Sequence, residues 1–345
     1  MQYFNYKHSL SCNKESNNLF SPEQDLVSSH YPVRVSNYYA GLIQKKGDAI
    51  WKQCMPDPKE LEDHDQRPDP LHEESLSPVP GLIHRYPDRV VLLVSNRCPV
   101  YCRFCMRKRL VGSGDAPMPE ADFKNALAYI AANPTIRDVI LSGGDPLMLS
   151  DESLFHILSS LRTINHISII RIGSRVPVTL PERITSELCN ILRQFHPLYI
   201  NTHFNHPAEI TDNSGRACAM LADAGIQLGN QTVLLKGVND DSEVMRNLMS
   251  GLLEIRVKPY YLHQMDLVQG TAHFRTSVNT GLEIIRALRG HISGLAVPHY
   301  VIDLPGGKGK VAILPDMMER KGDLLLLRTY TGEQVFYKDV TTVPE

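Results

Sequence analysis

Short apolar segments alternate with amphipathic segments six times along residues 89–289, and this alternation constrains the fold more than any other feature. The apolar, β-branched runs cover residues 89–95, 138–142, 167–172, 198–201, 226–235 and 257–263. The helical patterns cover residues 120–132, 152–161, 182–194, 215–224, 242–254 and 278–289. Because parallel strands need crossover connections, the pattern predicts an α/β protein, either a partial (β/α)6 barrel of the TIM type or a doubly wound sheet. Strands this apolar are expected to be buried on both faces, with the chemistry at their carboxyl ends.

The sequence on either side of this core predicts two appendages. Residues 1–80 are expected to form an N-terminal appendage, in which residues 36–54 are helical and the following proline-rich segment is irregular and wraps the surface. Residues 81–315 then form the barrel core. Residues 316–345 are expected to be a short C-terminal extension, with a hairpin over residues 323–337.

Charge and hydropathy argue against several classes of protein. The net charge is −2 and there is no long block of one sign, so nothing indicates nucleic-acid binding. No apolar run approaches the roughly 18 residues of a membrane helix, and the first residues lack the apolar region of a secretory signal. We therefore expect a cytoplasmic protein that binds neither nucleic acid nor membrane.

Three of the cysteines, Cys98, Cys102 and Cys105, follow the first predicted strand in a C-x3-C-x2-C spacing. Thiolates are soft ligands that suit an iron–sulfur cluster or zinc. Three ligands with no obvious fourth nearby leave one iron of a [4Fe–4S] cubane open to bind the amine and carboxylate of a small molecule. Structural zinc sites instead pair C-x2-C elements with a fourth ligand. The spacing favours the cluster, with zinc or chance clustering as the alternatives.

Two glycine-rich segments lie elsewhere in the core. Gly143, Gly144 and Asp145 follow the second predicted strand, where glycines let the backbone approach a ligand and the aspartate can pair with an ammonium. Lys310 lies in the segment DLPGGKGK, which lacks the G-x4-G-K-[ST] pattern of a P-loop. A lysine on a flexible glycine-rich lip suits a Schiff base with pyridoxal phosphate (PLP); the alternative is a basic surface turn.

With these residues the chain resembles the radical S-adenosylmethionine (SAM) superfamily and, within it, the lysine 2,3-aminomutase family. The resemblance runs from about residue 75 to 315, through CPVYCRFCMRKR (98–109), SGGDPL (142–147), NTHFNHPAEIT (201–211), GNQTVLLKGVND (229–240), KPYYLHQMDLVQGTAHFRT (258–276) and DLPGGKGK (303–310). It implies an isomerase that interconverts L-lysine and β-lysine with a [4Fe–4S] cluster, SAM and PLP. An enzyme that serves elongation factor P modification, or an aminomutase acting on another amino acid, is the alternative.

The resemblance also implies which residues hold the cofactors. The cluster is expected on Cys98, Cys102 and Cys105. Lys310 corresponds to the lysine that binds PLP and takes part in catalysis, and Arg85 and Arg89 to arginines that hold its phosphate. SAM is expected to be bound by the glycine loop and two further residues, namely Gly143, Gly144, Asp145, His203 and Gln231.

Substrate recognition is expected at three further charged residues. Arg107 corresponds to the arginine that binds the α-carboxylate. Asp266 and Asp303 correspond to two acids that bind the distal ammonium of lysine, and their charge would repel the side chain of glutamate.

The resemblance further implies partners, and one departure from the family. A reductase, flavodoxin or ferredoxin is the expected electron donor, and a homo-oligomer is the expected assembly. Clostridial relatives carry a zinc site made by a cysteine after the GVND segment and by C-terminal cysteines. Here Asp241 stands at that position and no cysteine follows Cys218, so we expect no such zinc.

Overall fold

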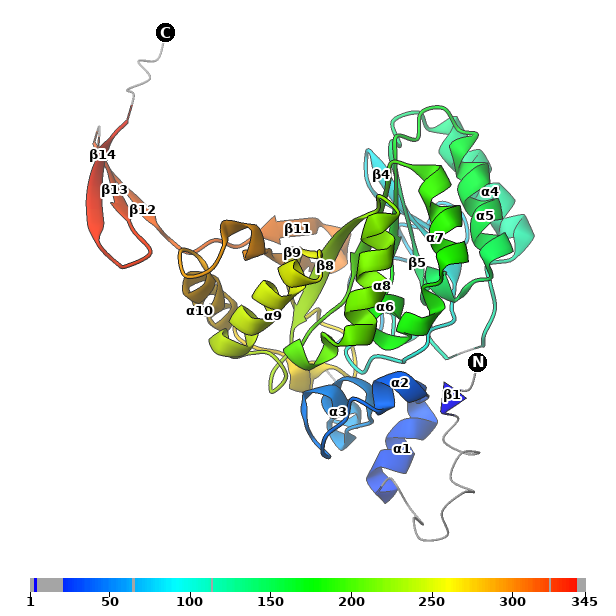
Figure 1. Ribbon diagram of the computed structural model, residues 1–345, viewed down its shortest axis with the longest axis horizontal. Helices are drawn as coiled ribbons and strands as arrows, with labels where there is room; N and C mark the ends of the chain where they lie inside the picture. Colours follow the sequence, from blue (N-terminus) through cyan, green and yellow to red (C-terminus); the bar gives the residue numbers. More distant parts are fainter. Residues whose placement is uncertain (1–2, 5–20, 64–65, 113, 323, 340–345) are drawn as a thin grey trace.

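The protein is described here from a computed structural model, which describes residues 3–4, 21–63, 66–112, 114–322 and 324–339 (Figure 1). A single sheet at its centre has the strand order β11-β10-β9-β8-β7-β6-β5-β4-β3. Its strands are β3 (Leu82–Tyr86), β4 (Arg89–Ser95), β5 (Asp138–Gly143), β6 (Ile169–Gly173), β7 (Leu198–Thr202), β8 (Gln227–Leu234), β9 (Lys258–Gln264), β10 (His299–Leu304) and β11 (Gly309–Ala312). Strands β4 to β10 are parallel, while β3 and β11 add antiparallel edges.

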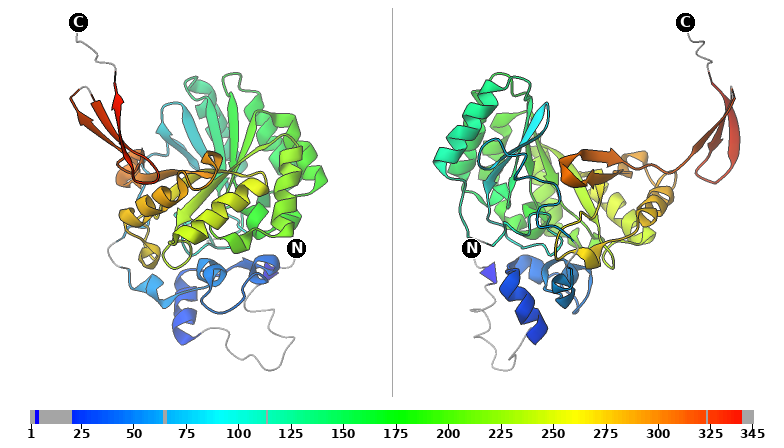
Figure 2. Two further views of the ribbon diagram at one scale, coloured as in Figure 1. Left: turned by 60° about the vertical axis from the view of Figure 1, so that its left-hand side comes forward. Right: turned by 180° about the vertical axis from the view of Figure 1, so that it is seen from behind.

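The sheet curves into a partial barrel whose outer face is covered by helices (Figure 2). They are α4 (Glu120–Ala132), α5 (Asp151–Arg162), the short α6 (Val176–Thr179), α7 (Ser186–Leu192), α8 (Asp212–Asp223), α9 (Ser242–Glu254) and α10 (Val278–Leu288). The six predicted strand–helix units and the barrel are confirmed, and the doubly wound alternative is wrong. The sequence pattern missed the seventh parallel strand, β10, because its glycine-rich continuation suggested a loop.

Burial alternates along the barrel strands, which differs from the expectation that both faces are buried. On β6, Ile170 and Ile172 are fully buried against the helices, whereas Ile169 and Arg171 line a cavity inside the barrel. The sheet is thus closely packed on its outer face, while its inner face lines the cavity with both apolar and charged side chains. Burying side chains of this size contributes about 1.5–3 kcal/mol each, so the outer layer between sheet and helices forms the core.

The helix α9 shows how local sequence sets this packing. Its buried residues Met245, Leu248, Met249 and Leu252 recur at three- and four-residue spacing, which gives one apolar face. Asp241, which follows the GVND segment, caps this helix. Its carboxylate accepts hydrogen bonds from the backbone N–H groups of Glu243 and Val244, at 2.9 and 3.0 Å.

The N-terminal appendage contains three short helices, α1 (Pro22–His30), α2 (Asn37–Ala40) and α3 (Ala49–Cys54), and a small sheet of β1 (Tyr3–Phe4) and β2 (Val35–Ser36). The prediction of one helix over residues 36–54 is wrong. Asp48 begins a second helix within that segment, where its side chain accepts a hydrogen bond from the Trp51 N–H, as Ser36 accepts one from Tyr39 at the start of α2. The segment after α3 is irregular apart from a 3-10 turn, as its prolines predicted.

This appendage packs against the loop that carries the three cysteines. Glu60 is buried beneath that loop and forms ion pairs with Arg103 and Lys108, both at 2.5 Å. Removing one partner from such a buried group typically costs about 3–5 kcal/mol. The appendage therefore fixes the cysteine loop against the barrel.

The C-terminal extension is a three-stranded antiparallel sheet of β12 (Met318–Lys321), β13 (Leu324–Arg328) and β14 (Gln334–Lys338), which projects from the body of the molecule (Figure 1). The predicted hairpin corresponds to β13 and β14, while β12 was not predicted. Nowhere in the described part of the chain is a helix both long and apolar enough to span a membrane.

Candidate active site

A cavity of about 1120 Å³ runs along the inner face of the barrel. Every residue that the sequence singled out for a site lines it: Arg85, Arg89, Cys98, Cys102, Cys105, Arg107, Gly143, Gly144, Asp145, His203, Gln231, Asp266, Asp303 and Lys310. These residues span more than two hundred positions of sequence. Those on the loops after the parallel strands meet because the carboxyl ends of such strands share one rim, whereas Arg85, Arg89 and Lys310 lie on strands β3, β4 and β11.

The three cysteines lie on the loop after β4, at one end of the cavity. Burial raises the pKa of Cys105 to about 11 and that of Cys98 well above its usual value, and the neighbouring thiols add to both shifts. Metal binding would deprotonate them. Among the described residues, no three of His, Cys, Asp and Glu converge closely enough to hold a single metal ion. A cubane makes no such demand, because each thiolate binds a different iron, so the three thiols fit a [4Fe–4S] cluster.

The Gly143–Gly144 loop fits tightly against the segment that leads into the cysteines. A Cβ on Gly143 would lie 2.2 Å from the Ser95 carbonyl oxygen, and one on Gly144 would lie 2.5 Å from that of Arg97. The Gly144 N–H donates to the Ser95 carbonyl at 2.6 Å. Gly143 also has φ +123°, which side chains disfavour. Only glycine allows this approach, which sets the two loops beside each other at the cavity wall.

The side chain of Asp145 forms four hydrogen bonds within the chain. Its Oδ1 accepts hydrogen bonds from the Ser174 hydroxyl and the Leu147 N–H, and its Oδ2 accepts from the N–H groups of Arg175 and Val176. These bonds occupy the four lone-pair positions of the carboxylate. Burial raises the pKa of Asp145 to about 6. Asp145 therefore joins the ends of β5 and β6, and the backbone of Gly143 and Gly144 faces the cavity.

His203 and Gln231, on the loop after β7 and on β8, contact each other at the cavity wall. Burial lowers the pKa of His203 to about 4, and the positive charge of Arg175 lowers it further. The hydrogen bond with Gln231 has the opposite effect and raises this pKa. His203 is therefore neutral near pH 7, and its uncharged ring and the Gln231 amide offer hydrogen bonds to a bound ligand.

Lys310 and Asp303 face each other across the β10–β11 hairpin, where they are paired residues of the register. The Lys310 ammonium forms an ion pair with the Asp303 carboxylate, which also pairs with Arg85 at 2.6 Å. The Lys310 backbone N–H donates to the hydroxyl of Tyr86 at 2.9 Å. The lysine thus stands on a strand, not on the flexible lip that its glycines suggested, and Tyr86 holds that strand against β3.

Asp266 lies after β9, close to this charged group. Burial raises the pKa of Asp266 to about 7, with a further rise from the negative charge of Asp303. His263, which the sequence analysis missed, lines the same region, and burial lowers its pKa well below the usual value, helped by the positive charge of Lys310. A second cation placed between Asp266 and Asp303 would relieve the repulsion between them.

Arg107 and Arg89 differ in how they are held. Arg107 is buried in a bidentate ion pair with Glu73, with contacts of 2.8 and 2.9 Å, and donates to the Ser142 hydroxyl at 3.0 Å. These contacts use three of its five N–H groups, and the others remain for a ligand carboxylate. Arg89 lies over the Tyr86 ring, 3.9 Å from its centroid, at the other end of the cavity.

Glu73 and Arg175 are site residues that the sequence analysis missed. Glu73 belongs to the proline-rich segment, which carries no periodic pattern, and its partner Arg107 is 34 residues away. Arg175 follows β6 and its Nη1 lies 2.8 Å from the Cys102 sulfur, 73 residues away. No local signal marks either residue, because only the packing of distant segments makes them neighbours.

A cysteine loop, a glycine loop and a curved parallel sheet around one cavity are the parts of a radical SAM enzyme, and residues 92–249 match the family described as the radical SAM superfamily. Residues 285–343 match the family described as lysine-2,3-aminomutase, which crosses the boundary expected at residue 315. The chain is 51% identical to the L-lysine 2,3-aminomutase of Fusobacterium nucleatum, over 89% of this chain and 73% of the relative. The protein belongs to the lysine 2,3-aminomutase family of radical SAM enzymes.

Other relatives include both substrate types. The L-lysine 2,3-aminomutase of Methanococcus maripaludis is 52% identical over 88% of this chain and 71% of the relative. The glutamate 2,3-aminomutase of Clostridioides difficile is 46% identical over 92% of this chain and 76% of the relative. Membership in the family makes the protein an isomerase with a [4Fe–4S] cluster, SAM and PLP as cofactors.

Proposed function

We propose that this protein is an L-lysine 2,3-aminomutase. The observation that carries the proposal is the pair of carboxyl groups, Asp266 and Asp303, in the same region of the cavity as Lys310. A lysine side chain ends in an ammonium, which two acids bind well, whereas a glutamate side chain would add a third negative charge. The site therefore favours lysine by its charge.

The cofactors supply the radical and hold the migrating amino group when bound, while the residues of the chain bind and orient. In this proposal the three cysteines hold the cluster. The neutral His203, Gln231 and the glycine loop surround SAM. Lys310 and the two arginines on and beside β3, Arg85 and Arg89, hold PLP.

The substrate is held at both ends. The two N–H groups of Arg107 that the chain leaves unused bind its α-carboxylate, and Glu73 keeps the guanidinium plane fixed. The two acids bind the distal ammonium. Fixing both ends limits the motion of the reacting carbons, which is where positioning lowers the barrier.

The test compares substrates on anaerobically reconstituted protein with SAM, PLP and dithionite. We expect β-lysine from L-lysine and little product from L-glutamate. The variant Asp266→Asn, which removes one charge at nearly constant shape, should lower kcat/KM for lysine by roughly tenfold to a hundredfold, as expected for loss of a hydrogen bond to a charged group. Robust turnover of glutamate with none of lysine would overturn the proposal.

We also propose a setting for the enzyme. A radical SAM enzyme needs a reductant, and a reductase, flavodoxin or ferredoxin would supply it. The exposed apolar side chains of Val335, Phe336 and Tyr337 on β14 support a homo-oligomer, because exposed apolar clusters often mark contacts between proteins. The free thiols of the described cysteines support a cytoplasmic location.

A further inference from the structure

The side chain of Arg175 is buried between the N-terminal appendage and the cysteine loop. It is only 8% exposed, and its Nη1 donates a hydrogen bond to the Cys102 sulfur at 2.8 Å. Arginine keeps its positive charge in proteins. A fixed positive charge therefore lies in contact with the middle thiol of the three that fit the cluster.

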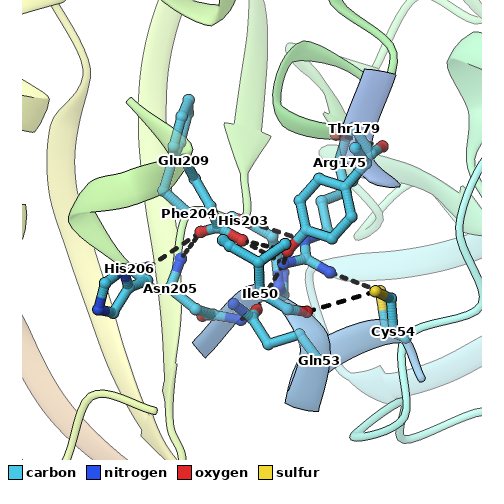
Figure 3. Close-up of polar contacts among 12 residues, drawn as sticks. Ile50, Gln53, Cys54, Arg175, Thr179, His203, Phe204, Asn205, His206 and Glu209 are labelled. Carbon is cyan, nitrogen blue, oxygen red and sulfur yellow. Dashed lines mark hydrogen bonds and ion pairs between the residues drawn. The ribbon is translucent and has the colours of Figure 1, made fainter. Parts of the chain in front are cut away.

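The donors on Nε and Nη2 of Arg175 are also occupied (Figure 3). Its Nε donates to the His203 carbonyl at 3.0 Å, and its Nη2 contacts Gln53 at 2.6 Å and Glu209 at 2.7 Å. These bonds come from three separate parts of the chain and fix the plane of the guanidinium. The side chain has no freedom to turn away from the sulfur without breaking several of them.

Glu209 is the counter-charge of this arginine and is fully buried. Its second oxygen accepts hydrogen bonds from the backbone N–H groups of Asn205 and His206, at 2.5 and 2.9 Å. Tyr39, from the appendage helix α2, donates to the first oxygen at 2.6 Å. The loop with the three cysteines therefore adjoins a buried ion pair. The Arg175 guanidinium contacts the Cys102 sulfur, and the Glu209 carboxylate contacts the guanidinium.

The charges near an iron–sulfur cluster and the hydrogen bonds to its sulfurs set its reduction potential. Reduction adds one negative charge to the cluster. A positive charge and an N–H bond at a ligand sulfur stabilise that added charge, and a negative charge behind the arginine weakens the effect.

We propose that Arg175 and Glu209 set the reduction potential of the [4Fe–4S] cluster through the sulfur of Cys102, with Arg175 raising the potential and Glu209 lowering it. Both are positioning residues, because they act through the ligand and not on the substrate. The inference rests on the cluster that the family carries and holds for any amino-acid substrate, so it stands or falls separately from the choice of lysine.

The test is a redox titration of the reconstituted holoprotein, monitored by the electron paramagnetic resonance signal of the reduced cluster, without and with SAM. Arg175→Gln should lower the ratio of reduced to oxidised cluster about tenfold at a fixed potential, which is about 59 mV for a one-electron couple. Glu209→Gln should shift the potential upward. Arg175→Lys, which keeps the charge, should restore part of the loss.

Arg183→Gln is the matched control. Arg183 is buried to a similar extent, but within the described part of the chain its hydrogen bonds go to the Leu149 carbonyl and to Asp151, with which it pairs at 2.6 Å, and not to a cysteine. At equal iron content, we expect the cluster in Arg183→Gln to have the same reduction potential as in the unchanged protein. A merely structural role for Arg175 and Glu209 would give shifts of the same sign, or none.

Three results would overturn the proposal. The first is equal potentials in Arg175→Gln, Glu209→Gln and the unchanged protein. The second is a shift that occurs only with SAM bound, which would mean that Arg175 acts on SAM and not on the sulfur. The third is loss of iron from folded Arg175→Lys and Glu209→Gln protein, which would assign the pair to cluster retention.

Discussion

Asp266 and Asp303 show how single residues in this cavity depend on their neighbours. Asp303 is neutralised within the chain by Arg85 and Lys310. Asp266 has no such ion pair within the described part of the chain, and burial of its carboxyl group and the charge of Asp303 raise its pKa to about 7. Because a bound ammonium would favour its charged form, Asp266 is the acid whose protonation should respond to substrate.

This shift predicts a pH dependence for lysine binding. The substrate ammonium binds the charged carboxylate of Asp266. Below pH 7 Asp266 must lose a proton before lysine binds, so the affinity for lysine should fall by up to about tenfold for each pH unit below 7. Calorimetric titration of holoprotein with lysine between pH 6 and 8 measures this. In Asp266→Asn, binding should be weaker and the slope should vanish. A slope that persists in Asp266→Asn would contradict the role of this residue.

The raised pKa of Asp266 also predicts how the free energy of unfolding depends on pH. The native state keeps the Asp266 proton up to about pH 7, while the unfolded chain loses it near 3.8, the usual pKa of an aspartate. The native state then binds more protons across this window, so this group makes the free energy of unfolding fall as pH rises from about 4 to about 7. His203 acts in the opposite direction between its pKa of about 4 and the usual 6.5. Denaturant titrations of Asp266→Asn should show the first slope removed.

At the scale of elements, two loops meet at the rim of the barrel. The glycine loop after β5 touches the backbone of residues 95–97, which leads directly into Cys98. The position of the cysteines is therefore determined by a neighbouring loop as well as by their own spacing. A side chain added between the loops must displace one of them.

We predict that Gly144→Ala lowers the iron content after reconstitution. Its Cβ would lie 2.5 Å from the Arg97 carbonyl oxygen, and overpacking of this kind costs about 1–3 kcal/mol. Iron and sulfide analysis with thermal unfolding measures both effects. Gly294→Ala is the control, because a Cβ there has no heavy atom within 4 Å. Full iron incorporation and unchanged stability in Gly144→Ala would disprove the steric argument.

At the scale of the whole molecule, the appendages differ in their relation to the barrel. The N-terminal appendage contributes Tyr39, Gln53 and Glu60 to buried contacts around the cysteine loop. The C-terminal sheet projects from the body of the molecule. Tyr330, between β13 and β14, contacts the body at His291, with ring centroids 5.4 Å apart. We infer that the first is part of the site and that the second is a separate module.

Removal of residues 316–345 should therefore leave the cavity intact. We expect the shortened protein to bind PLP and iron to the same extent as the full chain, with a modest change in thermal midpoint. Absorbance of the bound PLP and iron analysis measure this, and sedimentation reports any change of assembly. Loss of both cofactors from folded protein would show that the C-terminal sheet supports the site.

The sequence alone determined the barrel and most of the residues around its cavity. Periodic apolar residues fix strands and helices locally, and the cysteine and glycine motifs follow strands directly, so their position at the rim could be predicted. The split of residues 36–54 into two helices was less clear, because Ser36 and Asp48 compete as caps with the apolar pattern around them.

Only the tertiary structure decided which charged side chains meet. Arg85 pairs with Asp303 across 218 residues, Arg107 with Glu73 across 34, and Arg175 with Cys102 across 73. It also gave Asp145 four hydrogen bonds within the chain, which no sequence pattern indicated. A polar side chain leaves no periodic trace of its partner, because the partner is set by how distant elements pack and by the need to satisfy every buried charge.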